Sequence, residues 1–108
     1  MREQAVSAAF KALADPTRRR LFERIVNAGE LSISRLTEGS GISQPAVSQH
    51  IAALKSAGLV SSRREGRLAH YTACKTGLAP LADWLTAYGV FWQKRFERLE
   101  RLLEEMDE

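Results

Sequence analysis

The residues best suited to chemistry lie in one short polar stretch that reads SQPAVSQH, from Ser43 to His50. Serine, glutamine and histidine side chains carry hydrogen-bonding groups that are costly to bury without partners. A glutamine amide can pair with the edge of adenine, a serine hydroxyl can donate or accept, and small neighbours let the backbone come close. We therefore interpret the stretch as a surface for nucleobases, on condition that one element presents these side chains together.

Apolar spacing predicts that this element is a helix. Val47, Ile51 and Leu54 recur at i, i+4 and i+7, so one stripe packs on the core. Ser43 or Gln44 would cap its start, and with about 100° between successive residues Gln49 falls almost opposite the stripe. The rest of the outward face consists of Gln44, Pro45, Ala46, Ser48 and Ala52. This face is small and amide-bearing, unlike the lysine and glutamate coat of an ordinary solvated helix.

Local signals place a pair of helices at the start of the chain. The alanine-rich segment around Phe10 predicts a helix from about Gln4 to Ala14, which must end where Asp15 precedes Pro16. Asp15 can then cap a second helix with Pro16 at its first position. The apolar stripe of the second helix consists of Leu21, Phe22, Ile25 and Val26.

A tight turn then leads to the polar helix. Gly29 is placed to end the second helix, and a short third helix is expected from about Ile33 to Glu38. Ser40-Gly41 turns the chain into the next element. A short helix, a tight turn and a helix with polar early residues form the helix-turn-helix arrangement. The alternative is that two core helices happen to be joined by Ser-Gly.

Two short extended segments follow, LVSSRR at 59–64 and RLAHYT at 67–72, around the turn residues Glu65-Gly66. This pattern predicts a β-hairpin. Basic residues at its tip suit a loop that lies along phosphates, although arginines that protect an exposed edge from aggregation give the same pattern. A hairpin directly after a recognition helix is called a wing, and the combination favours DNA.

The charge distribution agrees with a polyanionic partner. The chain has 16 basic and 13 acidic residues, but four of the acidic ones lie within 104–108. Residues 1–103 therefore carry a net charge of +7, with arginines gathered at 18–20 and at 63, 64 and 67. Such a field attracts polyanions, although a solvated basic surface has the same composition.

Length and composition restrict the class of protein. A chain of 108 residues forms one domain with a modest core, and domains of this size often gain burial from a partner chain. No apolar run approaches the roughly 20 residues that cross a bilayer, and the first ten residues do not resemble a signal peptide. The single Cys74 cannot form an intrachain disulfide. We expect a soluble cytoplasmic protein without a membrane partner.

The last third of the chain predicts a long amphipathic helix from Pro80 to Met106. At 1.5 Å per residue it would span roughly 40 Å, whereas a compact chain of this size has a radius of gyration of about 13 Å. The helix should protrude, and a second copy would cover its apolar ridge. The residues expected in this dimer interface are Leu85, Tyr88, Trp92, Leu99, Leu102 and Met106.

Three linked motifs, FKALADPTRRRLFERI, ISQPAVSQHIAALKSAGLV and RREGRLAHYT, resemble the ArsR/SmtB-type family of bacterial winged-helix transcriptional regulators over nearly the whole chain. The resemblance implies a mostly α winged helix-turn-helix fold with about five helices, a small β-hairpin and a long C-terminal dimerisation helix. It also implies a homodimeric repressor of an inverted-repeat operator in double-stranded DNA. Residues 1–108 would form a single domain, with dimerisation helices at 1–14 and 79–106, the helix-turn-helix at 33–57 and the wing at 59–73.

The resemblance also assigns roles by position. The residues that would face bases or nearby phosphates are Gln44, Pro45, Ser48 and Gln49. The residues that would mainly contact the DNA backbone are His50, Arg63, Arg64 and Arg67. By the same analogy, the first helix would contribute Phe10 and Leu13 to the dimer.

The chain departs from the metal-sensing members of the family. In the stretch ELSISRL, Ser32 and Ser34 stand where those members carry a pair of cysteines, and hydroxyls do not replace soft thiolate ligands. A second family site uses Asp and His on the last helix, which here contains Asp83 and no histidine. We therefore expect no metal and no other cofactor, and the effector remains unknown. Cys74 lacks a resolving partner within the chain, so a buried apolar role is expected for it.

Two other classes of function are alternatives to a transcriptional regulator. A winged-helix protein-interaction module would use the same surfaces and would bind DNA weakly and without salt dependence. An enzyme would need a base, a nucleophile and an orienting group together, and Cys74, His50 and His70 form no such grouping. We expect no catalytic residues.

Overall fold

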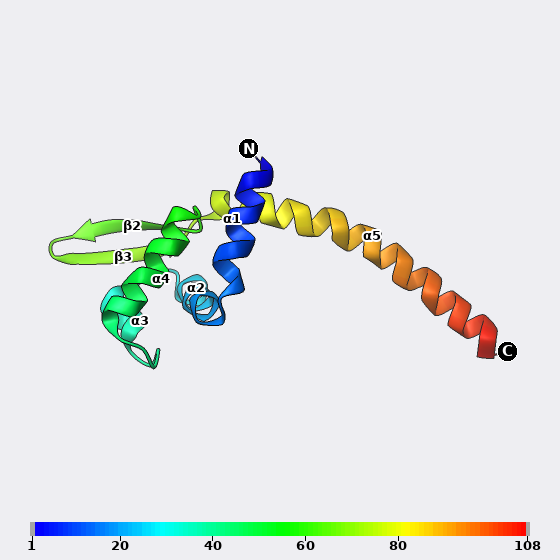
Figure 1. Ribbon diagram of the computed structural model, residues 1–108, viewed down its shortest axis with the longest axis horizontal. Helices are drawn as coiled ribbons and strands as arrows, with labels where there is room; N and C mark the ends of the chain where they lie inside the picture. Colours follow the sequence, from blue (N-terminus) through cyan, green and yellow to red (C-terminus); the bar gives the residue numbers. More distant parts are fainter. Residues whose placement is uncertain (1, 108) are drawn as a thin grey trace.

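The computed structural model describes residues 2–107, which form five helices and three strands (Figure 1). The helices are α1 (Arg2–Ala14), α2 (Pro16–Ala28), α3 (Ile33–Thr37), α4 (Gln44–Ser56) and α5 (Lys75–Asp107). The strands are β1 (Leu31–Ser32), β2 (Val60–Glu65) and β3 (Leu68–Ala73), in the antiparallel order β1-β3-β2. The mostly α fold with a helix-turn-helix, a hairpin and a long last helix is confirmed. The short strand β1 was not predicted.

Side-chain caps fix the starts of α2 and α4. The Asp15 carboxylate accepts a hydrogen bond of 2.9 Å from the backbone N–H of Arg18, which also lowers the pKa of Asp15. The Ser43 hydroxyl accepts one of 3.3 Å from the N–H of Ala46, so Ser43 is the cap of α4. Both caps satisfy N–H groups that a helix leaves unpaired in its first turn. Gly29 ends α2 with φ 86°, as predicted.

The core lies where α2, α3 and α4 meet the sheet. The predicted stripe of α4 is fully buried, with Val47, Ile51 and Leu54 at 0 to 1% exposure. Val26, predicted on the stripe of α2, is instead 49% exposed. It lies at the edge of that stripe, about 140° around the helix from Leu21, so only the other three stripe residues reach the core.

The last helix begins earlier than the sequence predicted. Because proline is favoured in the first turn of a helix, the sequence predicted a start at Pro80. The helix α5 instead begins at Lys75 and contains Pro80 in its second turn. The early turn is held by tertiary contacts, because the N–H of Cys74 donates to the carbonyl of Leu59 at 2.8 Å and Leu78 packs against the core. These contacts outweigh the one helical hydrogen bond that proline cannot donate.

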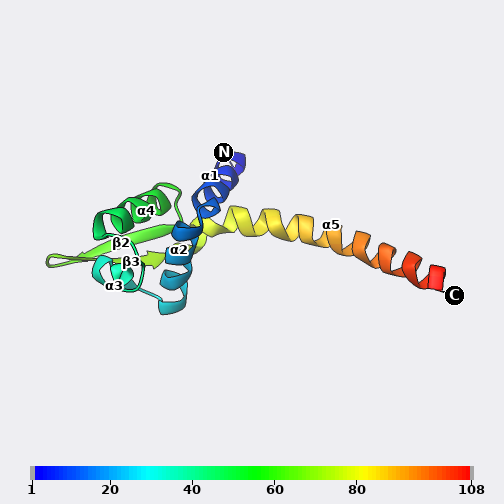
Figure 2. The same cartoon turned by 60° about the horizontal axis from the view of Figure 1, so that its bottom comes forward.

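Beyond its first turns, α5 leaves the rest of the molecule (Figures 1 and 2). Its 33 residues correspond to about 50 Å at 1.5 Å per residue. The protein accordingly measures 68 × 33 × 20 Å, with a radius of gyration of 18.6 Å. This exceeds the value of about 13 Å for a compact chain of similar length. No helix among residues 2–107 has both the length and the apolar character needed to cross a membrane.

A glycine contact joins α5 to the turn after α4. A Cβ added at Gly77 would collide with the carbonyl oxygen of Gly58, the residue whose φ of 78° reverses the chain after α4. The two backbones therefore touch without an intervening side chain. The first turn of α5 is held directly against the end of the polar helix.

We expect Gly77→Ala to destabilise the protein by about 1–3 kcal/mol, because one of the two backbones must move. Gly89→Ala is the matched control, since a Cβ there meets nothing within 4 Å. That change should stabilise the helix by about 0.5–1 kcal/mol. Urea unfolding of both variants at one protein concentration measures the difference, and equal stabilities would contradict the contact.

Candidate nucleic-acid interface

The outward face of α4 is polar, exposed and without internal partners. Gln44, Pro45, Ser48 and Gln49 are all exposed, which confirms the orientation predicted for Gln49. Within the described chain, the Gln44 and Gln49 amides and the Ser48 hydroxyl form no hydrogen bond with another residue. Because the opposite stripe is fully buried, α4 cannot rotate this face inward. Donors and acceptors are therefore presented together at the surface.

His50 lies at the edge of this face and has a partner inside the protein. Its Nδ1 accepts a hydrogen bond of 3.4 Å from Nε of Arg18, and Nη1 of Arg18 donates to the carbonyl of Ala12 at 3.3 Å. Arg18 thus links the end of α1 to α4. The contact of His50 with a DNA backbone stays a prediction.

Arginines 18–20 also have structural roles that the sequence reasoning missed. Nη1 of Arg19 donates to the carbonyl of Leu13 at 2.9 Å, and Nε of Arg20 donates to that of Pro16 at 3.4 Å. The last carbonyls of a helix lack partners, and Arg18 and Arg19 supply them at the end of α1, whereas the Arg20 contact lies within α2. The sequence carried one signal of these structural roles, since the basic run lies just after the predicted end of the first helix.

The hairpin is tied to α4, and its three arginines differ in their surroundings. Nζ of Lys55 on α4 donates to the hydroxyl of Ser62 on β2 at 2.9 Å. Arg64 and Arg67 are exposed and form no ion pair with another described residue. Arg63, in contrast, is bonded to the carboxylates of Glu30 and Glu65. Arg64 and Arg67 are thus the wing arginines available to an external anion.

An apolar surface runs along α5 and continues onto α1. All the α5 residues predicted for a dimer interface are exposed, from 47% for Tyr88 to 80% for Met106. Phe10 of α1 is 41% exposed and packs edge-on against Trp84, with ring centroids 5.1 Å apart. Leu13 is half-buried against the core. A continuous surface of this kind is unusual on a monomer.

Cys74 does not have the buried apolar role predicted for it. It is half-exposed directly before α5, and its Sγ lies 3.2 Å from the hydroxyl of Thr76. That hydroxyl and then the N–H of Gly77 lower the pKa of the Cys74 thiol. The prediction failed because the helix starts at Lys75, so the unpaired groups of its first turn surround the sulfur.

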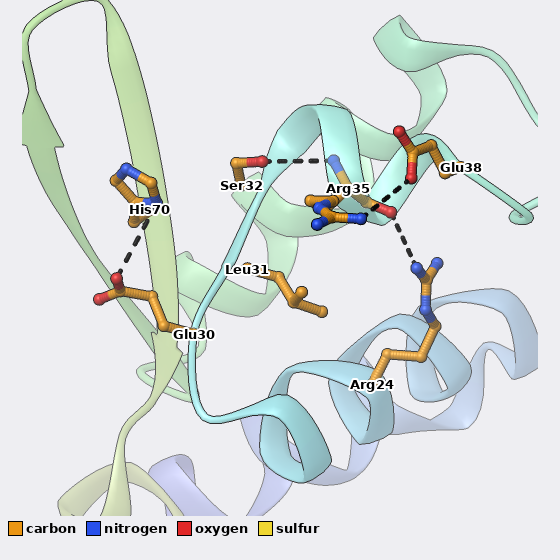
Figure 3. Close-up of a pocket in the computed structure, with 7 residues that line it drawn as sticks. All are labelled: Arg24, Glu30, Leu31, Ser32, Arg35, Glu38 and His70. Carbon is orange, nitrogen blue, oxygen red and sulfur yellow. Dashed lines mark hydrogen bonds and ion pairs between the residues drawn. The ribbon is translucent and has the colours of Figure 1, made fainter.

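A hollow of about 460 Å³ lies beside β1 and is lined by Ser32, one of the two serines that the resemblance aligns with a cysteine pair (Figure 3). Its lining residues are Arg24, Glu30, Leu31, Ser32, Arg35, Glu38 and His70. The Ser32 hydroxyl caps α3 by accepting from the N–H of Arg35 at 3.3 Å, and Arg24 donates to the carbonyls of Arg35 and Leu36 at 2.8 and 2.7 Å. Residues 2–107 contain no group of three or more His, Cys, Asp or Glu that could hold a metal ion. Ser32 and Arg24, two of the polar residues that line this hollow, hold α3 in place.

Comparison with known proteins extends over most of the chain. A family model described as a helix-turn-helix domain matches residues 13–63. The HTH-type transcriptional regulator Rv2034 of Mycobacterium tuberculosis is 38% identical over 96 residues, which cover 89% of this chain and 86% of that protein. The transcriptional repressor SdpR of Bacillus subtilis is 33% identical over 76 residues, covering 70% of this chain and 83% of SdpR. The solved structure of an ArsR-like transcriptional regulator from Rhodococcus sp. RHA1 is similar with a TM-score of 0.72 and 29% identity, covering 93% of each chain.

The fold, the polar face of α4 and the wing define a winged helix-turn-helix protein that binds DNA to regulate transcription. The chain belongs to the ArsR family of transcriptional regulators. The family resemblance drawn from the three sequence motifs is confirmed. The protein is a regulator and not an enzyme.

Proposed function

We propose that this regulator is a homodimeric repressor that reads an inverted-repeat operator with α4 and holds the DNA backbone with its wing. The observation that carries the proposal is the exposed face of α4, whose Gln49 amide has no partner within the described chain. A glutamine in this position can bond bidentately to adenine in the major groove, and Ser48 can serve a neighbouring base. Pro45 and Ala46 keep the face small enough for close approach.

The wing would supply contacts that do not depend on sequence. Arg64 and Arg67 are exposed near the tip of the hairpin, and Lys55 connects that hairpin to α4. Arginines that meet phosphates position a protein on the duplex, whereas base contacts provide its specificity. The two surfaces therefore have different roles on one DNA site.

The apolar surface of α5 supports the homodimer. A second copy would cover the exposed ridge that ends with Leu99, Leu102 and Met106, together with Phe10 of α1. A two-fold axis presents two copies of α4 to DNA, and half-sites one helical turn apart are separated by about 34 Å. An inverted repeat has the same symmetry as such a dimer.

We also propose that the repressor does not sense metals. Ser32 is engaged as the cap of α3, and hydroxyls are poor substitutes for thiolate ligands. Selecting bound fragments of genomic DNA with the purified protein would identify the operator, and the genes beside it would point to the regulated pathway. Recovery of a shared inverted repeat supports the proposal, and recovery of random fragments contradicts it.

Gln49→Ala should weaken operator binding by about 1–3 kcal/mol and relax the base preference, because a bidentate base contact is lost. Arg67→Ala should weaken operator and random DNA alike and lower the salt slope, because a phosphate contact is lost. Gln93→Ala on α5 serves as the control. Titration of labelled duplexes at several salt concentrations measures both effects, and equal losses on specific and random DNA for both variants would contradict the two roles.

Leu99→Glu should give a monomer that no longer binds the operator, because a charge replaces an apolar side chain in the proposed interface. Glu100→Ala changes the next residue of the same helix and should leave the dimer intact. Sedimentation analysis measures the association state. A dimeric Leu99→Glu variant would show that the interface lies elsewhere.

Equilibrium dialysis against zinc should find no stoichiometric binding at sub-micromolar free metal, since the cysteine pair of the thiolate sensors is absent. Zinc bound at one ion per chain, with release of DNA, would overturn this part of the proposal.

A further inference from the structure

Four charged or titratable side chains form a cluster on one face of the sheet. Nη2 and Nε of Arg63 donate to the two carboxylate oxygens of Glu30 at 2.6 and 2.9 Å, and Nη1 donates to Oε2 of Glu65 at 3.1 Å. His70 lies between the carboxylates, with Nδ1 3.9 Å from Glu30 and Nε2 3.7 Å from Glu65. Figure 3 shows Glu30 and His70 side by side at the edge of the hollow.

The cluster lies on the face of the wing that is turned away from α4. Successive side chains of a strand point to opposite faces. Ser62 bonds to Lys55 of α4, and Arg64 lies two residues further along on the same face. Arg63 shares the other face with His70, its cross-strand partner. Arg63 and Arg64 therefore lie on opposite faces of the hairpin, and of the two only Arg64 shares the face that contacts α4.

The guanidinium of Arg63 is also occupied by carboxylates. Its contact with Glu30 is bidentate, which is among the stronger geometries for an ion pair. Hydrogen bonding from Arg63 lowers the pKa of Glu30, so Glu30 remains charged at neutral pH. Three of the five N–H groups of Arg63 are thus bonded to carboxylates, and the two negative charges beside it weaken its attraction for a phosphate.

Glu30 belongs to a different part of the chain from the wing. It follows Gly29, which ends α2, and precedes β1, which is only two residues long. The backbone pairing of β1 with β3 is limited to Leu31 with Tyr71 and Ser32 with His70. The Arg63–Glu30 pair therefore reaches from β2 past β3 to the segment after α2. It adds a side-chain connection where the backbone makes few hydrogen bonds between these parts.

We infer that Arg63 is a positioning residue that fixes the wing to the segment after α2 through Glu30, with Glu65 of the same strand holding its guanidinium, and that it does not contact DNA phosphates. The inference rests on the proposed DNA-binding function and replaces the phosphate contact that the family resemblance implies for Arg63. Arg64 and Arg67 keep the phosphate contacts.

The salt dependence of operator binding tests the absence of a phosphate contact. Each phosphate neutralised contributes about 0.9 to the slope of log K against log salt. Arg67→Gln should lower the slope by about that amount for each site contacted, whereas Arg63→Gln should leave it unchanged. Equal decreases in both variants would overturn the inference.

Hydrogen exchange in the free protein tests the positioning role without DNA. Glu30→Gln and Arg63→Gln should each speed exchange of β2 and β3 amides, by about two- to fivefold for an exposed ion pair. The double variant should be no faster than Arg63→Gln alone, because both lose the same contact with Glu30. Unchanged exchange in the single variants, or fully additive effects in the double variant, would overturn the inference.

The two measurements separate this inference from the proposed function. If the wild-type protein binds no DNA, the proposed function fails and the exchange data still decide whether Arg63 holds the wing. If it binds an operator and Arg63→Gln lowers the salt slope, only the inference fails. Glu97→Gln on α5 is a control for the loss of a carboxylate distant from the wing.

Discussion

Burial of the apolar stripe on α4 is the constraint on which the rest of the surface depends. Val47, Ile51 and Leu54 are almost completely inaccessible, so the rotation of the helix about its axis is fixed by the core. Gln49 and Ser48 are consequently held in water, where their hydrogen bonds are made to solvent and can be exchanged for those of another partner. If the apolar stripe were no longer buried, α4 could rotate, and its polar face would lose its fixed orientation although none of the residues on that face had changed.

Local chemistry made much of the fold predictable. The cap at Asp15, the end of α2 at Gly29 and the stripe of α4 each depend on residues within about two turns of one another, and all three were predicted correctly. The cap of α4 was narrowed to Ser43 or Gln44, and the structure assigns it to Ser43. The strand β1 and the start of α5 were missed because distant contacts decide them. β1 is too short to show an alternating pattern, and the hydrogen bond from Cys74 to Leu59 has no sequence signature.

The basic residues show how much of the DNA-binding surface could be predicted from charge alone. The sequence predicted a single cationic field, but Arg18 and Arg19 bind carbonyls at the end of α1 and Arg63 binds two carboxylates. Alternation along β2 already separated Arg63 from Arg64, so this distinction was present in the sequence. The partner Glu30 was not predictable, since it lies 33 residues away and reaches the wing only through the fold.

The backbone contact between Gly58 and Gly77 makes the junction of α5 sensitive to angle. A helix of about 50 Å acts as a lever, so a tilt of only about 5° at this junction would displace its far end by about 4 Å. Side chains packed between two elements can change rotamer and so accommodate a small change in the angle between them, but two glycines in backbone contact cannot. The position of the far end of α5 is therefore set by backbone atoms at its first turn, where no side chain can adjust to correct a change in angle.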